Sequence, residues 1–298
     1  MRILVTGKNG QLGRSIQKLV NADIAIDNNH SSNEFVFVGR EELDLSSENS
    51  TSHYFDNNDK VDIIINCAAY TQVDKAEQEA GLANQINHVA VKQLASIANN
   101  QQARLIHIST DYVFNGRQCQ PYIETDNVEP QGVYGKTKLS GEQAIQNHLK
   151  SNAIIIRTSW IYSEYGNNFV KTMLKLGNEL ESLNVIFDQV GTPTYAGDLA
   201  KAILSIVRSN TFSQTGFKTQ IYHFSNEGVC SWYDFAKTIF ELTDTQCQVN
   251  PIETKDYPTP GTRPHYSVLN KSKIKKKYNL VIPYWKDSLR LCLNRRRV

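Results

Sequence analysis

The sequence of 298 residues predicts an α/β fold, in which a doubly wound parallel sheet is joined to a smaller, discontinuous second domain. The first observation is that short apolar runs, rich in β-branched residues, alternate with longer helical patterns through the first half of the chain. The second is that these runs are continuously apolar, as strands are when helices cover both faces of a sheet. The third is that the alternation ends near residue 160, which indicates a change of domain.

Five apolar runs in the first half are predicted to be strands, and they cover residues 2–6, 35–39, 62–67, 104–109 and 153–158. Helical patterns separate these runs, at about residues 10–20, 47–57, 82–100 and 131–149. In the third helix, Leu82, Ile86 and Val89 begin an apolar stripe at helical spacing. Alternation of this kind predicts right-handed crossovers between parallel strands.

Beyond residue 160 the pattern is less regular. Helices are expected near residues 168–181, 197–208, 231–242 and 284–293, and short strands near 184–187 and 221–224. Four prolines forbid a regular helix between residues 251 and 264, so an irregular loop is expected there. We expect one domain to comprise residues 1–163 and 196–225, the other to comprise 164–195 and 226–298, and ligands to bind in the crevice between them.

Composition and charge exclude several classes of protein. Lys and Arg total 32 against 30 Asp and Glu, and this balance excludes a broad electrostatic nucleic-acid binder. No apolar run approaches the ~20 residues that span a bilayer, and the apolar N-terminal run leaves no room for a cleavable signal, so no membrane partner is expected. Five scattered cysteines predict free thiols in a reducing, cytoplasmic compartment. None of the seven histidines has a metal-ligand spacing, so no metal site is predicted.

The sharpest local signal follows the first run, where the sequence TGKNGQLG opens a helix. Glycines at positions 7, 10 and 13 suit a tight turn, a close approach of backbone to pyrophosphate, and packing of helix on strand. The start of that helix offers unpaired N–H groups to phosphates. The turn therefore predicts a Rossmann-like, dinucleotide-binding domain, whose cofactor contacts are Gly7, Gly10, Gln11, Leu12 and Gly13.

The end of the second run bears on the choice of cofactor. The run leads into Arg40, at the position where an acidic residue would hold the adenosine ribose 2′-hydroxyl of NADH. A guanidinium group suits a 2′-phosphate instead. We therefore expect NADPH as the cofactor, with NADH as the alternative.

A Tyr-x-x-x-Lys motif lies on the helix predicted at 131–149. A spacing of four places Tyr134 and Lys138 on one face, whereas Lys136 points away. A neighbouring ammonium is expected to lower the pKa of the Tyr134 phenol, so that the pair can protonate an alkoxide as it forms. Thr110 follows the fourth run and is placed to share the substrate oxygen with Tyr134. The sequence thus predicts a reductase with Thr110, Tyr134 and Lys138 as catalytic residues, and with Tyr134 and Lys138 also contacting the cofactor.

The Gly-x-x-Gly-x-x-Gly turn and the Tyr-x-x-x-Lys motif together resemble the extended short-chain dehydrogenases and reductases. Within that group the chain is similar from end to end to the dTDP-4-dehydrorhamnose reductase family. Six separated stretches carry the similarity, at residues 68–77, 109–114, 133–139, 157–162, 166–169 and 257–264.

The resemblance implies a reaction and a set of contacts. A hydride passes to the 4-keto carbon of dTDP-4-dehydro-β-L-rhamnose, Tyr134 gives the proton, and dTDP-L-rhamnose for polysaccharide biosynthesis results. Asp44 and Leu45 border the adenine. The cofactor's ribose and pyrophosphate run beside Ala69, Tyr70 and Thr71. The dTDP-sugar is implied to contact Thr110, Asp111, Trp160, Asn168 and Arg263, with Trp160 against the sugar ring and Arg263 at the diphosphate.

Two alternatives remain open at this point. One is a nucleotide-sugar dehydratase or epimerase of the same fold, although Tyr112 stands where the dehydratase pattern Thr-Asp-Glu has its glutamate. The other is a regulatory subunit that binds NADP without turnover, which the presence of Tyr134 and Lys138 argues against. Homo-oligomerisation, dependence on Mg²⁺ and the glycoconjugate that receives the product are left open.

Overall fold

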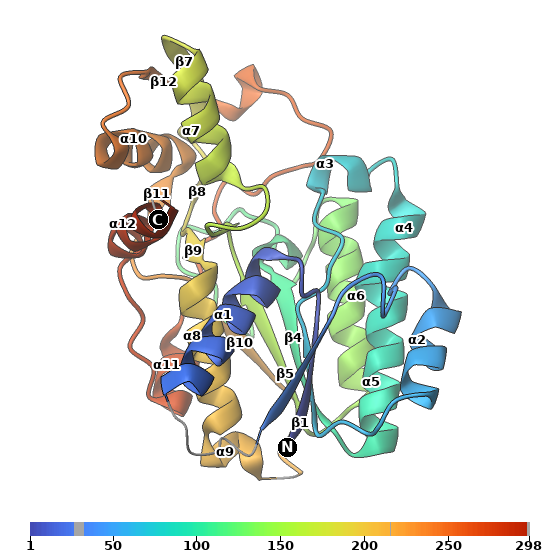
Figure 1. The fold of residues 1–298 in the computed structure, drawn as a ribbon. Helices are drawn as coiled ribbons and strands as arrows, with labels where there is room; N and C mark the ends of the chain where they lie inside the picture. Colours follow the sequence, from blue (N-terminus) through green and yellow to red (C-terminus); the bar gives the residue numbers. More distant parts are fainter. Residues whose placement is uncertain (27–32, 215, 297–298) are drawn as a thin grey trace.

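The computed structural model describes residues 1–26, 33–214 and 216–296. Six parallel strands form the central sheet in the order β10-β5-β4-β3-β1-β2 (Figure 1). Their bounds are Arg2–Thr6 for β1, Glu34–Val38 for β2, Ile63–Asn66 for β3, Arg104–Thr110 for β4, Ala153–Thr158 for β5 and Gln220–His223 for β10. The predicted doubly wound α/β fold is confirmed, and each predicted strand of the sheet lies within two residues of its expected place.

Helices cover both faces of this sheet (Figure 1). On one face, α1 (Gln11–Ile26) and α8 (Ala196–Arg208) bury apolar side chains against β1, β3, β4 and β5. On the other face lie α2 (Glu48–Asp56), α5 (Ala90–Gln101) and α6 (Val133–His148), which pack on the same strands. Burial on both sides is why the strands are continuously apolar in sequence.

The helix predicted at 82–100 is not one regular helix. It is divided into α4 (Ala80–Asn84), a π-helical turn (Gln85–Val89) and α5. The wider turn changes which side chains face inward, because it adds a residue to the helical repeat. As a result Leu82, which was expected in the apolar stripe, is 40% exposed, whereas Ala83 is fully buried.

A second apolar core lies beyond the sheet. It is formed by α7 (Phe169–Glu179), β7 (Ser182–Ile186), α10 (Trp232–Thr243), β12 (Gln248–Ile252) and α12 (Trp285–Arg296). The irregular loop predicted at 251–264 begins inside β12, which forms a two-stranded sheet with β7, so Pro251 lies where a missing N–H is tolerated. We propose that these two cores define the two domains expected from the sequence.

Several short elements were not predicted. Among them, α11 (Ser272–Tyr278) inserts Ile274 into the core of the main sheet, although the sequence assigned this segment to the second domain. The others are α3 (Val73–Ala76), the 3-10 turns at Asp111–Val113 and Thr254–Asp256, α9 (Asn210–Ser213), β6 (Ile161–Tyr162), β8 (Val190–Gly191), β9 (Thr194–Tyr195) and β11 (Cys230–Ser231).

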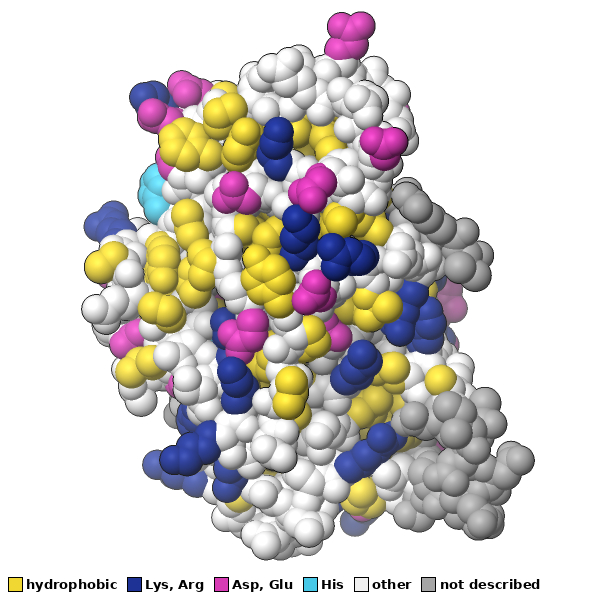
Figure 2. Space-filling view, turned by 90° about the vertical axis from the view of Figure 1, so that its left-hand side faces the viewer, with side chains coloured by type: hydrophobic (Ala, Val, Ile, Leu, Met, Phe, Trp, Pro, Cys, Tyr) yellow, Lys and Arg dark blue, Asp and Glu magenta, His cyan; other side chains and the backbone are white. Residues whose placement is uncertain are grey.

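The surface charge is mixed rather than concentrated. On the face shown in Figure 2, Lys and Arg side chains are spread among Asp and Glu side chains and do not gather in one patch. Lys271 and Lys275, from the basic run near α11, both pair with Glu227. Within the described residues, none of the helices combines the length and the hydropathy that crossing a membrane requires.

Candidate active site

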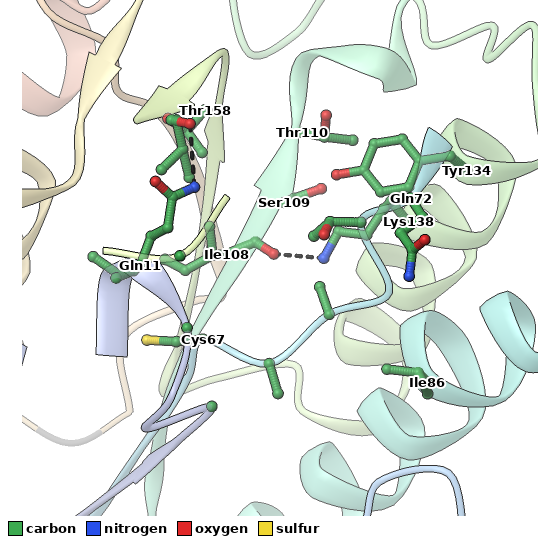
Figure 3. Close-up of a pocket in the computed structure, with 18 of the residues that line it drawn as sticks. Gln11, Cys67, Gln72, Ile86, Ile108, Ser109, Thr110, Tyr134, Lys138 and Thr158 are labelled. Carbon is green, nitrogen blue, oxygen red and sulfur yellow. Dashed lines mark hydrogen bonds between the residues drawn. The ribbon is translucent and has the colours of Figure 1, made fainter. Parts of the chain in front are cut away.

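A cavity of about 1020 Å³ lies at the carboxyl ends of the sheet strands. This is the edge of a doubly wound sheet at which ligands bind. Thr6 ends β1, Thr110 ends β4 and Thr158 ends β5, and all three line the cavity. Figure 3 shows Gln11 on one side of it and Tyr134 and Lys138 on the other. Of the predicted site residues, fourteen line it: Gly7, Gly10, Gln11, Leu12, Arg40, Asp44, Leu45, Ala69, Thr71, Thr110, Asp111, Tyr134, Lys138 and Trp160.

The glycine turn has the shape that a diphosphate needs. Gly7 has φ +72°, and a Cβ on it would lie 2.8 Å from the backbone nitrogen of Ala68. A Cβ on Gly13 would lie 2.3 Å from the carbonyl oxygen of Gly7, so this glycine serves the close packing of α1 and does not itself line the cavity. The first residues of α1 therefore reach the cavity with their N–H groups, which fits a dinucleotide.

Arg40 lies at the far end of the cavity from Tyr134, beyond the glycine turn. Its side chain is 78% exposed, and its Nε lies 3.3 Å from Asp44 Oδ2. Burial raises the pKa of Asp44, but hydrogen bonds from Ser46 and the charge of Arg40 outweigh it, so the pKa is lowered overall. An exposed guanidinium with one carboxylate partner is free to bind a phosphate in addition.

The segment after β3 borders the cavity through Ala69 and Thr71, but not through Tyr70. The Tyr70 hydroxyl donates to Glu79 Oε2 at 2.6 Å, and this bond raises the pKa of Tyr70 to about 12. The Asn87 side chain accepts a hydrogen bond from the N–H of Tyr70 and donates one to the carbonyl oxygen of Tyr70. Tyr70 thus fixes the shape of the segment on the side away from the cavity.

Tyr134 lies in the first turn of α6, beside the end of β4. Close approach is achieved through Gly135, because a Cβ there would lie 2.3 Å from the carbonyl oxygen of Tyr112. In Figure 3 the Tyr134 hydroxyl points toward Ser109 and Thr110. Burial raises the pKa of Tyr134 to about 12, although a hydrogen bond with the Thr110 side chain lowers it. The predicted lowering of this pKa is therefore wrong, because burial and the charge of Asp111 raise it by more than the hydrogen bond with Thr110 lowers it.

Lys138 lies one turn further along α6, and only 1% of it is exposed. Its Nζ donates to the carbonyl oxygen of Ile108 at 2.6 Å and lies 3.3 Å from His107 Nε2 (Figure 3 shows the first contact). Burial lowers the pKa of Lys138 to about 8, against the opposing charge of Glu142. Lys136 is exposed, as predicted.

Asp111 is a buried carboxyl group in the cavity wall. The Thr110 hydroxyl donates to its Oδ1 at 3.0 Å, and the Ser267 hydroxyl lies near enough to the carboxyl group to favour its ionised form. Burial raises the pKa of Asp111 to about 7, even though the bond from Thr110 lowers it. Near neutral pH this carboxyl group can therefore donate or accept a hydrogen bond at Oδ2.

Two tryptophans form an aromatic part of the cavity wall. The rings of Trp160 and Trp232 are stacked, with centroids 3.5 Å apart and planes at 11°. Trp160 has φ +48°, an uncommon conformation for a bulky residue that turns the chain just after β5. Sequence reasoning missed Trp232, which starts α10 far along the chain and carries no local motif.

Two predicted substrate contacts do not line the cavity. Asn168 caps α7, where its Oδ1 accepts from the N–H of Lys171, and its Nδ2 donates to Gln11 Oε1 at 2.9 Å. Arg263 forms a two-point ion pair with Asp74, with contacts of 2.9 and 2.7 Å. Both side chains were predicted to contact the ligand, but in the structure each is hydrogen-bonded to another residue of the protein.

Among the described residues, no three His, Cys, Asp or Glu side chains are grouped so that they could hold a metal ion. No disulfide joins any of the five cysteines in the part of the chain that the structure describes. Cys67 lies in the cavity wall, and burial raises its pKa to about 12. It is therefore a thiol rather than a reactive thiolate at neutral pH.

Comparison with known proteins identifies the family. A family model described as the RmlD substrate binding domain matches residues 1–298. A dTDP-4-dehydrorhamnose reductase from Aggregatibacter actinomycetemcomitans is 41% identical over 295 residues, which cover 97% of each chain. The chain belongs to the dTDP-4-dehydrorhamnose reductase family. The resemblance stated from the sequence motifs is thereby confirmed.

Solved structures of this reductase family have the same fold. A dTDP-4-dehydrorhamnose reductase from Clostridium acetobutylicum superposes with a TM-score of 0.90 at 39% identity, covering 100% of each chain. One from Bacillus anthracis, in complex with NADP, has a TM-score of 0.89 at 35% identity and covers 99% of each chain.

Proposed function

We propose that the protein is an NADPH-dependent oxidoreductase that reduces the 4-keto group of dTDP-4-dehydro-β-L-rhamnose to give dTDP-L-rhamnose. The observation that carries the proposal is the convergence of Thr110, Tyr134 and Lys138 on one cavity with the glycine turn. Membership of the dTDP-4-dehydrorhamnose reductase family supplies the substrate class.

The cofactor is NADPH, with NADH as the weaker alternative. Gly7, Gly10 and the start of α1 would hold the diphosphate, and Arg40 would bind the 2′-phosphate. The related reductase from Bacillus anthracis is in complex with NADP, which supports this choice. When bound, the reduced nicotinamide supplies the hydride.

The chain's own residues handle the proton. Tyr134 is a protonated phenol at neutral pH, since its pKa is raised to about 12, so it can give its proton to the 4-oxygen as that oxygen becomes an alkoxide. Thr110 would hold the same oxygen once its hydroxyl gives up the bond to Asp111 Oδ1, and its hydrogen bond with Tyr134 keeps the phenol beside it. The new C–H bond takes the hydride, the new O–H bond takes the Tyr134 proton, and a phenolate remains that solvent must reprotonate. Lys138 would hold the ribose of the nicotinamide through its side-chain nitrogen.

The sugar nucleotide would occupy the other half of the cavity. The Trp160–Trp232 wall suits the C–H-rich face of a deoxysugar, and the Asp111 carboxyl group in the cavity wall would bind a sugar hydroxyl. Arg263 would meet the diphosphate only after it exchanges one or both contacts with Asp74. Asn168 would act through the hydrogen bond that positions Gln11 beside the cofactor.

The proposal is tested by mixing the purified protein with dTDP-4-dehydrorhamnose and NADPH and following the absorbance of the reduced cofactor. Loss of one NADPH for each dTDP-rhamnose formed supports it. Conversion of the sugar without net use of NADPH would indicate the epimerase or dehydratase alternative. Binding of NADPH without turnover would indicate the regulatory subunit.

The protein is expected in the cytoplasm, because its cysteines form no disulfide among the described residues. Cell fractionation tests this location.

A further inference from the structure

A row of buried polar side chains lies behind the cavity wall and ends at Lys138. The Thr6 hydroxyl donates to Asn66 Oδ1 at 2.6 Å, and Asn66 Nδ2 lies 3.0 Å from His107 Nδ1. His107 Nε2 in turn lies 3.3 Å from Lys138 Nζ. None of these four side chains is more than 2% exposed. Buried polar groups need defined hydrogen bonds, so the direction of each bond in this row can be worked out.

The backbone sets that direction. The N–H of Ala68 can only donate, and it lies 3.2 Å from Asn66 Oδ1, which fixes the oxygen of the amide on that side. Asn66 Nδ2 therefore donates to His107, and His107 Nδ1 must accept. Burial keeps the pKa of His107 well below its usual value, so its ring is neutral. A neutral ring that accepts at Nδ1 carries its proton on Nε2.

This tautomer directs an N–H group at Lys138. An ammonium offers only donors, so an ammonium facing His107 Nε2–H would be a donor–donor contact. A neutral amine can accept from His107 with its lone pair while it donates to the carbonyl oxygen of Ile108. We propose that His107 is a positioning residue, which donates a hydrogen bond to Lys138 Nζ and favours the amine over the ammonium.

Other charged groups act on Lys138 as well. Glu142, on α6, favours the ammonium, but it is held in a two-point ion pair by Arg157 from β5 and accepts from Ser109. The titratable or charged groups that face or flank Lys138 from the packed elements are His107 and Asp111 at β4, Tyr134 and Glu142 on α6, Arg157 on β5 and Cys67 after β3. His107 is the one among them that approaches Nζ within hydrogen-bond distance.

The tautomer can be measured without any enzymatic assay. In the full-length ¹⁵N-labelled protein, long-range ¹H–¹⁵N spectra distinguish a protonated from an unprotonated ring nitrogen, and the His107→Asn variant assigns the signals by their loss. We expect a protonated Nε2 and an unprotonated Nδ1. A protonated Nδ1, or a doubly protonated ring, would overturn the proposal. Because no substrate is needed, this result does not depend on the proposed function.

The consequence for turnover does rest on the proposed function, and two variants separate its causes. His107→Gln keeps an N–H donor near the Nε2 position, whereas His107→Asn keeps an acceptor for Asn66 and presents nothing to Lys138. In the pH profile of kcat we expect His107→Asn to move the alkaline limb to higher pH by about one unit, a tenfold change in the acid constant, and His107→Gln to leave it in place. A shift to lower pH, or equal shifts, contradicts the proposal. If His107→Asn does not fold, His107→Gln and the NMR spectra of the native protein still decide it.

Discussion

The cofactor half and the sugar half of the cavity are built in different ways. The cradle for the cofactor comes from one strand, one turn and the start of one helix, so Gly7, Gly10 and Gly13 are close in sequence as well as in space. The aromatic wall of the sugar half joins Trp160 after β5 to Trp232 at the start of α10. A local motif can be recognised from sequence because its geometry is set within a few residues, whereas the wall exists only once the second core has folded.

The largest effect on kcat is expected at Tyr134, where the cofactor half and the sugar half of the cavity meet. Tyr134→Phe removes the proton donor and should lower kcat by about 10²–10⁴-fold while NADPH binding is kept. Steady-state rates and a fluorescence titration of NADPH measure the two quantities. Lys136→Ala, on the exposed side of the same helix, is the control and should be near normal. A Tyr134→Phe variant with near-normal kcat would remove Tyr134 from the reaction.

A single added methyl group is expected to disrupt the packing of the glycine turn against α1. Gly13→Ala places a Cβ 2.3 Å from the Gly7 carbonyl oxygen and should cost about 1–3 kcal/mol of unfolding free energy, together with the binding of NADPH. Gly81→Ala is the matched control, since a Cβ there meets nothing within 4 Å on a helix. Urea unfolding and NADPH titration compare the two. Equal behaviour of the two variants would mean that the close packing of α1 does not matter.

Arg40, which follows β2 and lines the cavity, is expected to set the choice of cofactor. Arg40→Ala should raise KM for NADPH by roughly 10-fold or more, because a hydrogen bond to a charged group is worth about 1.5–3 kcal/mol, and should leave KM for NADH unchanged. Parallel kinetics with the two cofactors test this. Equal changes for both would show that Arg40 does not reach the 2′-phosphate.

The aromatic wall should affect the sugar alone. Trp232→Ala should raise KM for the dTDP-sugar by about 3–10-fold, the equivalent of one aromatic contact, with the Kd of NADPH unchanged. Trp232→Phe keeps a ring and should lie between this variant and the native protein. A weaker affinity for NADPH in Trp232→Ala would mean that the two halves of the cavity are not independent.

The smallest effect concerns stability. In the folded protein the pKa of Asp111 is about 7, above its value in an unfolded chain, so the native state holds the proton more tightly and loses stability as pH rises toward 7. The Asp111→Asn variant has no carboxyl group to ionise at this position, so it does not lose stability in this way. Its Tm advantage over the native protein should therefore grow by several degrees between about pH 5 and about pH 8. Thermal melts at the two pH values measure it, and a constant or shrinking difference would mean that the carboxyl group is ionised throughout.

The sequence allowed the strands of the sheet, the glycine turn and the Tyr134–Lys138 pair to be predicted, because each depends on a pattern within one strand, turn or helix. It did not reveal that burial would raise rather than lower the pKa of Tyr134, since burial is a property of the assembled fold. Leu82 is exposed because the π-helical turn that follows it shifts the helical repeat, and the apolar pattern of the sequence does not reveal that turn. Arg263 shows a further limit, as its partner Asp74 lies far away in the chain.

The most direct test of the proposed reaction follows the hydride itself. Native protein is mixed with dTDP-4-dehydrorhamnose and NADPH that carries deuterium at the transferable position of its nicotinamide, and the dTDP-sugar product is analysed by NMR and mass spectrometry. We predict one deuterium at C4 of dTDP-L-rhamnose for each NADPH oxidised. Product that forms without deuterium at C4, or no product at all in the presence of bound NADPH, would contradict the account.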